Sequence, residues 1–166
     1  LIPPVYDEKF DLHSFAELGK QGVLLYMCDS TNAEREGYSL SERVVAQTLE
    51  KLFIENRERR MVVAAFASNV DRVQQVINAA VRNRRKVAVS GRSMINIAEA
   101  ASKIGELNIP ENLIIDVERI KNYKDEQILI VSTGTQGEPV SALTRMASGE
   151  FNKVVIGNND TVVISA

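Results

Sequence analysis

Short runs of polar side chains follow several apolar stretches of this chain, and their residue types suit the binding of an anion. The runs are Asp29-Ser30-Thr31, Ser68-Asn69, Ser90-Gly91-Arg92-Ser93 and Ser132-Thr133-Gly134. Hydroxyl groups donate hydrogen bonds, glycine permits close approach of the backbone, and the Arg92 guanidinium suits phosphate. Where such a run opens a helix, free N–H groups and the positive dipole end favour phosphate. Together the runs predict a phosphate-lined groove.

Each run also has a plainer interpretation. The serine and asparagine side chains could simply cap the N-termini of helices. Arg92 could form a surface ion pair instead of binding phosphate. Gln136 and Glu138, which flank Gly137 in the last loop, could bind a base or a sugar hydroxyl, or could stabilise a turn.

Composition and motifs exclude several classes of site. Neither G-x-G-x-x-G nor G-x-x-x-x-G-K-[ST] occurs in the sequence. The only histidine is His13, so a metal site lacks a ligand cluster and a Ser-His-acid triad lacks support. The only cysteine, Cys28, excludes an internal disulfide and is expected to be a small core residue. At a net charge of −2, any nucleic-acid contact would have to be local, or shared with parts that are not present in this sequence.

Hydrophobic patterning predicts the elements that would position these runs. The stretch Gly22–Asn32 opens with a continuous apolar run, which is typical of a strand buried on both faces. Further strands are predicted at 61–66, 86–89, 113–115, 127–131 and 161–164. Helices are predicted at 11–19 from an Asp11 cap, at 39–57, at 70–81 with Val81 facing inward, from the 90–93 loop to about 105, and at 141–148.

Strands that alternate with helices predict an α/β fold: a Rossmann-like parallel sheet flanked by helices. The polar runs would then meet at the carboxyl edge of the sheet, where ligands bind in such folds. A length of 166 residues suits a single domain, 1–166. The start without methionine and the apolar end are interpreted as those of an excised fragment. No apolar run reaches the roughly 20 residues of a membrane span, so no membrane partner is expected.

Several longer motifs resemble those of one known family. They are DSTNAE at 29–34, GYSLSE at 37–42, FASN at 66–69, KVAVSGRSM at 86–94, STGTQGEPVSAL at 132–143 and RMASGE at 145–150. This ordered set resembles ribonuclease J, and specifically the β-CASP domain that is inserted in nucleic-acid-processing members of the metallo-β-lactamase superfamily. The resemblance covers nearly the whole chain. One departure is Asp71, where the family usually has histidine.

The resemblance implies a function for a larger parent protein. Family members are cytoplasmic ribonucleases that use two zinc ions for 5′-to-3′ exonucleolytic and endonucleolytic cleavage in RNA processing and decay. Their metal ligands lie in the metallo-β-lactamase domain, so the fragment itself should hold no metal or other cofactor and should be inactive. Its partners would be RNA and that catalytic domain. The resemblance also allows a homo-oligomeric parent.

The resemblance also assigns roles to residues. Asp29 matches an acidic residue that lies next to the metal centre, where a carboxylate can accept the ring N–H of a metal-ligating histidine. The RNA phosphate contacts would fall to the loop residues Ser30, Thr31, Ser68, Asn69, Ser90, Gly91, Arg92, Ser93, Thr133, Gly134, Gln136 and Glu138. The alternative from another class is a stand-alone nucleotide- or phosphate-binding α/β module without catalysis.

Overall fold

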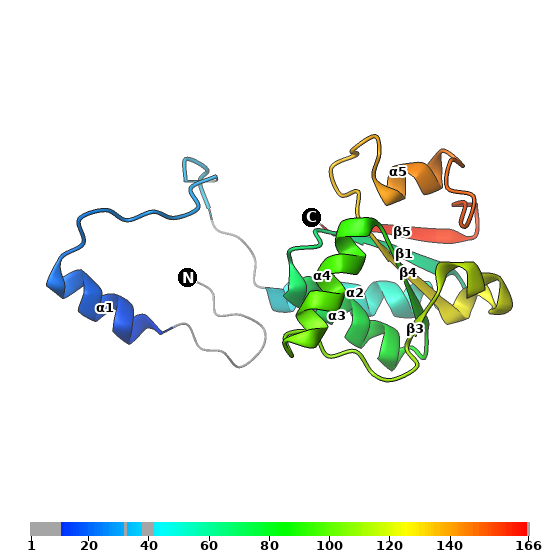
Figure 1. Cartoon of the computed structure of the whole chain (residues 1–166), viewed down its shortest axis with the longest axis horizontal. Coiled ribbons are helices and arrows are strands. Elements are labelled where there is room, and N and C mark those ends of the chain that lie inside the picture. The colour runs from blue at the N-terminus through cyan, green and yellow to red at the C-terminus, as the bar shows by residue number, and fades with distance from the viewer. Residues whose placement is uncertain (1–10, 32, 38–41, 166) are drawn as a thin grey trace. The chain divides into compact units, whose positions relative to one another are not determined.

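The structure, a computed structural model, describes residues 11–31, 33–37 and 42–165. The chain divides into two compact units, Leu1–Val45 and Ala46–Ala166. Figure 1 shows the helices of both units and the sheet of the second.

The first unit contains α1 (Leu12–Gln21) and the first residues of a second helix, α2 (Glu42–Glu55), which continues into the second unit. The Asp11 carboxylate caps α1 by accepting a hydrogen bond from the Ser14 N–H at 3.0 Å, as predicted from the sequence. Gly19, expected at the C-terminus, lies inside the helix, and Gly22 with φ 87° ends it. His13 is exposed on this helix.

The apolar run after α1 is not a strand, so the prediction of a buried strand at 23–28 is wrong. Residues 25–30 have no regular secondary structure, and Leu24, Tyr26 and Met27 are 103%, 68% and 82% exposed. Cys28 is also exposed rather than a core residue. A strand is stable only when it pairs with others and covers its apolar face, and no strand among the described residues pairs with this run. The apolar pattern shows that these side chains can be buried, but it does not show which other strand would pair with them.

The second unit is built on a five-stranded, all-parallel sheet in the order β3-β2-β4-β1-β5. Its strands are β1 (Arg60–Ala65), β2 (Lys86–Ser90), β3 (Ile114–Ile115), β4 (Ile128–Ser132) and β5 (Asp160–Ser165). The central strands are apolar at nearly every position because both faces are covered. β1 and β4 are buried throughout apart from Arg60. This confirms the predicted α/β class.

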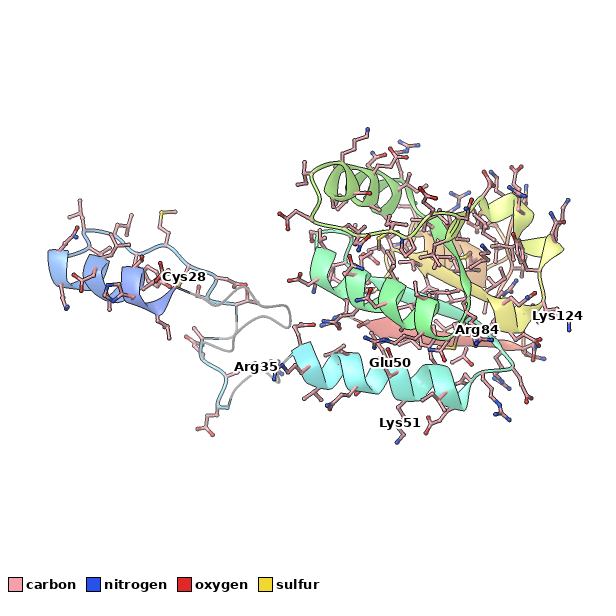
Figure 2. All side chains as sticks on the ribbon, turned by 90° about the horizontal axis from the view of Figure 1, so that it is seen from below. Cys28, Arg35, Glu50, Lys51, Arg84 and Lys124 are labelled. Atoms are coloured by element: carbon pink, nitrogen blue, oxygen red, sulfur yellow. The ribbon has the colours of Figure 1, made fainter. Side chains whose placement is uncertain are left out.

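Helices cover the two faces of the sheet. On one face, Val62, Ala88 and Ile130 of the strands pack with Leu143 and Met146 of α5 (Ala142–Ala147) and with Ile120 of the 3-10 helix η1 (Val117–Asn122). On the other face lie α3 (Val70–Arg82) and α4 (Arg92–Lys103). Figures 1 and 2 show α2 (Glu42–Glu55) running beside α3. The short 3-10 helix η2 (Asp125–Gln127) leads into β4.

The predicted elements of the second unit are confirmed, with ends that differ by a few residues. The first predicted residues of the 39–57 helix, 39–41, lie outside the described residues. One predicted orientation is wrong: Val81, expected to face inward, is 43% exposed. Val81 follows the fully buried Ala80 by one residue, and the turn of roughly 100° between successive helical residues brings its side chain toward solvent.

A buried arginine ties the amino-terminal end of the sheet together. Arg85 is 2% exposed. Its guanidinium donates to the carbonyls of Arg59 at 2.6 Å, Ile128 at 3.1 Å, Asn56 at 3.0 Å and Arg57 at 3.2 Å, and it lies over the Phe53 ring. Burial lowers the pKa of Arg85 from its ordinary value, and the charge of Glu126 partly offsets this. One side chain thereby satisfies backbone acceptors after α2, before β1 and at the start of β4.

A second arginine joins the edge strand to the sheet. Arg60 and Asp160 are paired residues on β1 and β5, and the guanidinium donates two hydrogen bonds to the carboxylate, both at 2.6 Å. The Asp160 side chain is 3% exposed and also accepts from the Gly157 N–H at 2.7 Å. This hydrogen-bonded pair raises the pKa of Arg60. A forked pair of this kind fixes the register of β5 against β1.

Candidate functional site

Two buried serines mark the carboxyl edge of the sheet, where β2 and β4 end. Ser90 and Ser132 are paired residues of these neighbouring strands, so their side chains point to the same face. They are 3% and 0% exposed, and neither hydroxyl oxygen has a hydrogen-bond partner among the described residues. A buried hydroxyl without a partner costs roughly 1–3 kcal/mol. A ligand that reaches this edge could recover part of that cost.

The chain leaves these two strands in opposite directions. After β2 it continues through α4 to β3 at one edge of the sheet, and after β4 it continues through α5 to β5 at the other. The connections that follow β2 and β4 therefore lead to opposite edges of the sheet, and the strand order reverses between these two neighbouring strands. In open α/β sheets, ligands bind at this point, where the strand order reverses.

The first turn of α4, directly after β2, has no side-chain cap. Its N-cap residue is Gly91, with φ 101°, which cannot supply a capping side chain. The exposed Arg92 opens the helix and forms no ion pair with any residue that the structure describes. Uncapped N–H groups beside an available guanidinium suit an anion. Ser93 is exposed in the same turn.

The loops after β2 and β4 pack closely against each other. A Cβ atom at Gly91 would meet the Thr133 Oγ1 atom at 2.7 Å. Gly134, with φ 119°, approaches the start of α5, and the Thr133 carbonyl accepts from the Leu143 N–H at 3.1 Å. The structure therefore brings together the predicted residues 90–93 and 133–134.

Other predicted site residues show the plainer roles that the sequence left open. Asn69 caps α3 by accepting from the Arg72 N–H at 3.0 Å, and Ser68 is placed just before it at the end of the loop after β1. The Glu138 carboxylate accepts from the Gln136 N–H at 3.2 Å, which stabilises the turn at Gly137. The Gln136 and Glu138 side chains are exposed.

Asp29, Ser30 and Thr31 lie in the first unit, in an exposed turn. The Asp29 Oδ1 atom accepts from the Thr31 Oγ1 atom at 2.6 Å and from the Thr31 N–H at 2.9 Å. These hydrogen bonds, the hydroxyl first, lower the pKa of Asp29. The carboxylate is thus satisfied by a nearby hydroxyl and a backbone N–H. No partner of the Oδ2 atom is found within the described ranges.

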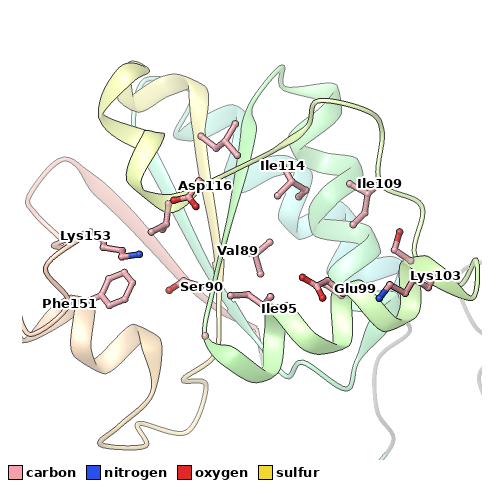
Figure 3. A pocket seen from close by; sticks show the side chains of 15 residues that line it. Val89, Ser90, Ile95, Glu99, Lys103, Ile109, Ile114, Asp116, Phe151 and Lys153 are labelled. Carbon is pink, nitrogen blue, oxygen red and sulfur yellow. The ribbon is translucent and has the colours of Figure 1, made fainter.

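A cavity that the sequence did not predict lies beside the carboxyl edge (Figure 3). It has a volume of about 730 Å³ and lies between α4, β3 and the 151–153 loop. Ser90 and Gly91 line it, together with Asp116, Phe151 and Lys153. The available sequence signal was the position of Asp116, directly after the predicted strand at 113–115. Nothing in the sequence places Phe151 or Lys153 near the cavity. Both residues follow β4 and α5 in the sequence, and only the tertiary fold brings them to α4 and β3.

A zinc site and a membrane span both need features that the described residues do not have. In the described part of the chain, no group of three or more His, Cys, Asp or Glu residues could hold a metal ion. The described residues therefore do not fit a zinc site. No helix among them is both long and apolar enough to cross a membrane.

Comparison with known proteins identifies the family of this chain. Residues 58–166, which include the whole sheet, match the sequence model of the family described as "Ribonuclease J, beta-CASP domain". The chain belongs to the ribonuclease J family.

Individual members of the ribonuclease J family match almost the entire chain. Ribonuclease J from Synechocystis is 44% identical over 98% of the chain, and ribonuclease J2 from Bacillus subtilis is 39% identical over 98%. Ribonuclease J from Mycolicibacterium smegmatis is 41% identical over 98%. The chain spans only 25%, 29% and 29% of these three relatives. It therefore corresponds to a fraction of each relative, and that fraction includes the β-CASP domain.

Proposed function

We propose that this chain is the RNA-binding β-CASP portion of a ribonuclease that hydrolyses phosphodiester bonds in RNA. Membership of the ribonuclease J family supports a ribonuclease parent. The observation that carries RNA binding is the pair of buried hydroxyls, Ser90 and Ser132, beside the uncapped start of α4 and the exposed Arg92. Hydroxyls, backbone N–H groups and a guanidinium are the groups that position a nucleic-acid backbone through its phosphates.

The finer part of the proposal concerns the whole enzyme. We expect it to be a zinc-dependent 5′-to-3′ exonuclease and endonuclease of the cytoplasm, in which a metallo-β-lactamase domain supplies the metal ligands. None of the residues described here is proposed as a zinc ligand, and the chain alone is expected to be inactive. The exposed apolar run at 23–27 supports a partner domain, because apolar side chains that adjoin in sequence are rarely left uncovered together. Self-association of the parent is part of the same proposal.

Replacing Arg92 by glutamine is expected to flatten the salt dependence of RNA binding. Each phosphate that a guanidinium neutralises adds about 0.7 to the slope of log affinity against log salt for a single strand. The chain and its Arg92→Gln variant would be titrated into a dye-labelled single-stranded RNA at four salt concentrations, with fluorescence anisotropy as the readout. The slope should fall by about 0.7, and the loss of affinity should be largest at low salt.

Arg84→Gln is the matched control for this titration. Arg84 is also a surface arginine and precedes β2, so it lies at the opposite, amino-terminal edge of the sheet, where Figure 2 labels it. Removing it lowers the net charge by the same amount without touching the carboxyl edge. If the two variants had equal slopes of log affinity against log salt, RNA binding would depend on the overall charge of the chain. That result would contradict the proposed site.

Asp29 is proposed to act in the whole enzyme by accepting an imidazole N–H from the catalytic domain. One of its oxygens already holds the Thr31 turn, and the other has no described partner. Asp29→Asn should therefore lower RNA degradation by the full-length enzyme by about 10- to 100-fold, the usual effect of losing such a partner. The amide keeps one acceptor for the turn, so the stability of the 166-residue chain should change by less than about 1 kcal/mol.

Two measurements separate this role from a purely local one. Degradation of a 5′-monophosphorylated RNA by the full-length enzyme gives the catalytic effect, and thermal melting of the chain gives the structural effect. A marked loss of stability in the chain together with normal degradation would show that Asp29 serves only its own turn. The alternative function is a binding module without catalysis. It predicts that the full-length protein that contains this chain does not degrade RNA.

A further inference from the structure

The cavity between α4 and β3 has the layout of a mononucleotide site. It lies within one strand-helix-strand unit, made of β2, α4 and β3. At one end are Ser90 and Gly91, at the end of β2 and the start of α4, and Asp116 follows β3 directly. In dinucleotide-binding folds, the phosphate lies at the corresponding helix start, and a carboxylate about 20 residues further on binds a ribose hydroxyl. Asp116 lies 26 residues after Ser90 in the sequence.

The phosphate end of the cavity has donors without acceptors. The Ser90 side chain is 97% buried, since it is 3% exposed, and its hydroxyl oxygen has no partner among the described residues. Beside it, α4 begins at Gly91 without a side-chain cap. Figure 3 shows Lys153 and Phe151 at the same end of the cavity as Ser90. The Lys153 Nζ atom lies 2.8 Å from Glu118 and its side chain is 48% exposed, so it can turn toward an anion at small cost.

The ribose position is set by Asp116. Its Oδ1 atom accepts from the Glu118 N–H at 2.7 Å, which caps η1 and fixes the carboxylate in place. The Oδ2 atom has no hydrogen-bond partner within the described ranges, and the charge of Lys153 in the same cavity interacts with this carboxylate. Figure 3 shows this carboxylate at the rim of the cavity, on the side away from α4. A held carboxylate with one available oxygen can accept from a ribose 2′-hydroxyl.

The base would lie along the apolar part of the cavity. Val89, Ile95 and Ile114 line its middle, and Ile109 lies toward the far end near Glu99 and Lys103. Ile95 and Ile114 are 40% and 39% exposed, although both belong to regular elements of the sheet unit. Partly exposed aliphatic side chains on two facing elements offer a slot for a flat ring. The cavity volume of about 730 Å³ is within the range of small-molecule sites.

The geometry points to a ribonucleotide 5′-monophosphate as the ligand of this cavity, with the phosphate at Ser90 and α4, the ribose at Asp116 and the base between Ile95 and Ile114. This inference goes beyond the proposed RNA binding, although both use Ser90 and Gly91. The ligand could be a free mononucleotide or one nucleotide of a bound RNA. Both sources present the same phosphate, 2′-hydroxyl and base.

The test uses amide NMR spectra of the 166-residue chain during titration with AMP, GMP, CMP and UMP. At least one of these probes should shift the amides of 90–95 and 114–117. The 2′-deoxy form of that nucleotide should bind about 10-fold more weakly, because it lacks the hydroxyl that Asp116 accepts from. A 5′-phosphorylated pentaribonucleotide of the same base distinguishes the source. Tighter binding of the pentamer at these amides indicates RNA, and tighter binding of the monomer indicates a free nucleotide; both support the site.

Asp116→Asn tests the residue itself. Asparagine keeps the oxygen that caps η1, so the chain should stay folded. Its affinity for the ribonucleotide should fall about 10-fold, to that of the deoxy form, while its affinity for the deoxy form should change less than about twofold. Glu111→Gln is the control, because Glu111 is exposed, lies in the connection between α4 and β3, and does not line the cavity. This substitution should change the affinity for neither nucleotide.

Three outcomes would overturn the inference. No shift at these amides with any of the four nucleotides or the pentamer would exclude the site. Equal binding of ribo- and deoxynucleotide would remove the ribose contact, and an equal loss for both in Asp116→Asn would make that residue structural only. Because the proposed RNA binding is tested by the Arg92 salt slope, it can hold while this inference fails, and the reverse is also true.

Discussion

Replacing Arg85 by methionine should lower the free energy of unfolding by about 3–5 kcal/mol. Methionine has a similar length and fills the same space, but it donates no hydrogen bond. Four backbone carbonyls would lose the guanidinium at once, although the Asn56 carbonyl keeps the Arg59 N–H as a donor at 3.0 Å. The Ile128 carbonyl is in a fully buried bond. Each buried acceptor left without a partner costs about 1–3 kcal/mol. The total stays below four times that value, because three of the bonds are only partly buried and water can replace some of them.

Urea unfolding of the chain, followed by circular dichroism, measures this loss. Arg84→Met is the control, because Arg84 is the preceding residue and its side chain makes no hydrogen bond or ion pair with the residues that the structure describes. Its unfolding free energy should stay within about 0.5 kcal/mol of the original. If Arg85→Met lost less than about 1 kcal/mol, the four carbonyls would have to be satisfied without the guanidinium.

Replacing Gly134 by alanine should lower the free energy of unfolding by about 3 kcal/mol or more. Its φ of 119° lies in a region that residues with a Cβ atom rarely adopt. The added Cβ atom would also lie 2.6 Å from the Ser141 Oγ atom and 2.7 Å from the Leu143 Cβ atom. Both contacts are with atoms close to the backbone of α5, so they cannot move aside without shifting the helix. Strain and overlap therefore add.

Gly137→Ala separates these two causes. Gly137 also has a positive φ, 71°, but a Cβ atom added there would have no atom within 4 Å. Its substitution should cost only about 1 kcal/mol, from backbone strain alone. Both variants would be compared by the midpoint of urea unfolding. Equal losses at the two positions would mean that the close packing of the β4 loop on α5 contributes nothing to stability.

The sequence predicted the sheet well because parallel strands carry a strong local signal. The runs at 60–65 and 128–132 are apolar at all but one position, and the run at 86–90 is apolar at its three inner positions, which is typical of strands covered on both faces. The same signal failed at 23–28, because a run of apolar residues becomes a strand only when a partner strand is present. The local pattern is equal in the two cases, and the difference lies in what surrounds the run.

The sequence predicted where in the fold the candidate site lies, but it did not predict the contacts between the residues of the site. Polar runs after strands indicated the carboxyl edge, since the ends of parallel strands must meet there. The pairing of Ser90 with Ser132 could not be predicted, because the register of two strands about 40 residues apart is set by tertiary packing. The role of Arg85 was missed for a related reason: carbonyls from separate segments converge on it only in the folded chain. Of the cavity residues, Ser90 and Gly91 were predicted from their place after a strand, and Asp116 has the same kind of local signal.

The exposed position of Cys28 gives a practical advantage in spectroscopy. It is the only cysteine of the chain, so a maleimide dye would attach at a single known position without any substitution. The sequence contains no tryptophan, so light emitted by the dye would be free of strong intrinsic fluorescence from the protein. Because Cys28 belongs to the unit Leu1–Val45, the polarisation decay of that dye would report how fast this unit rotates. Addition of a catalytic domain that covers the neighbouring apolar run would then slow the decay.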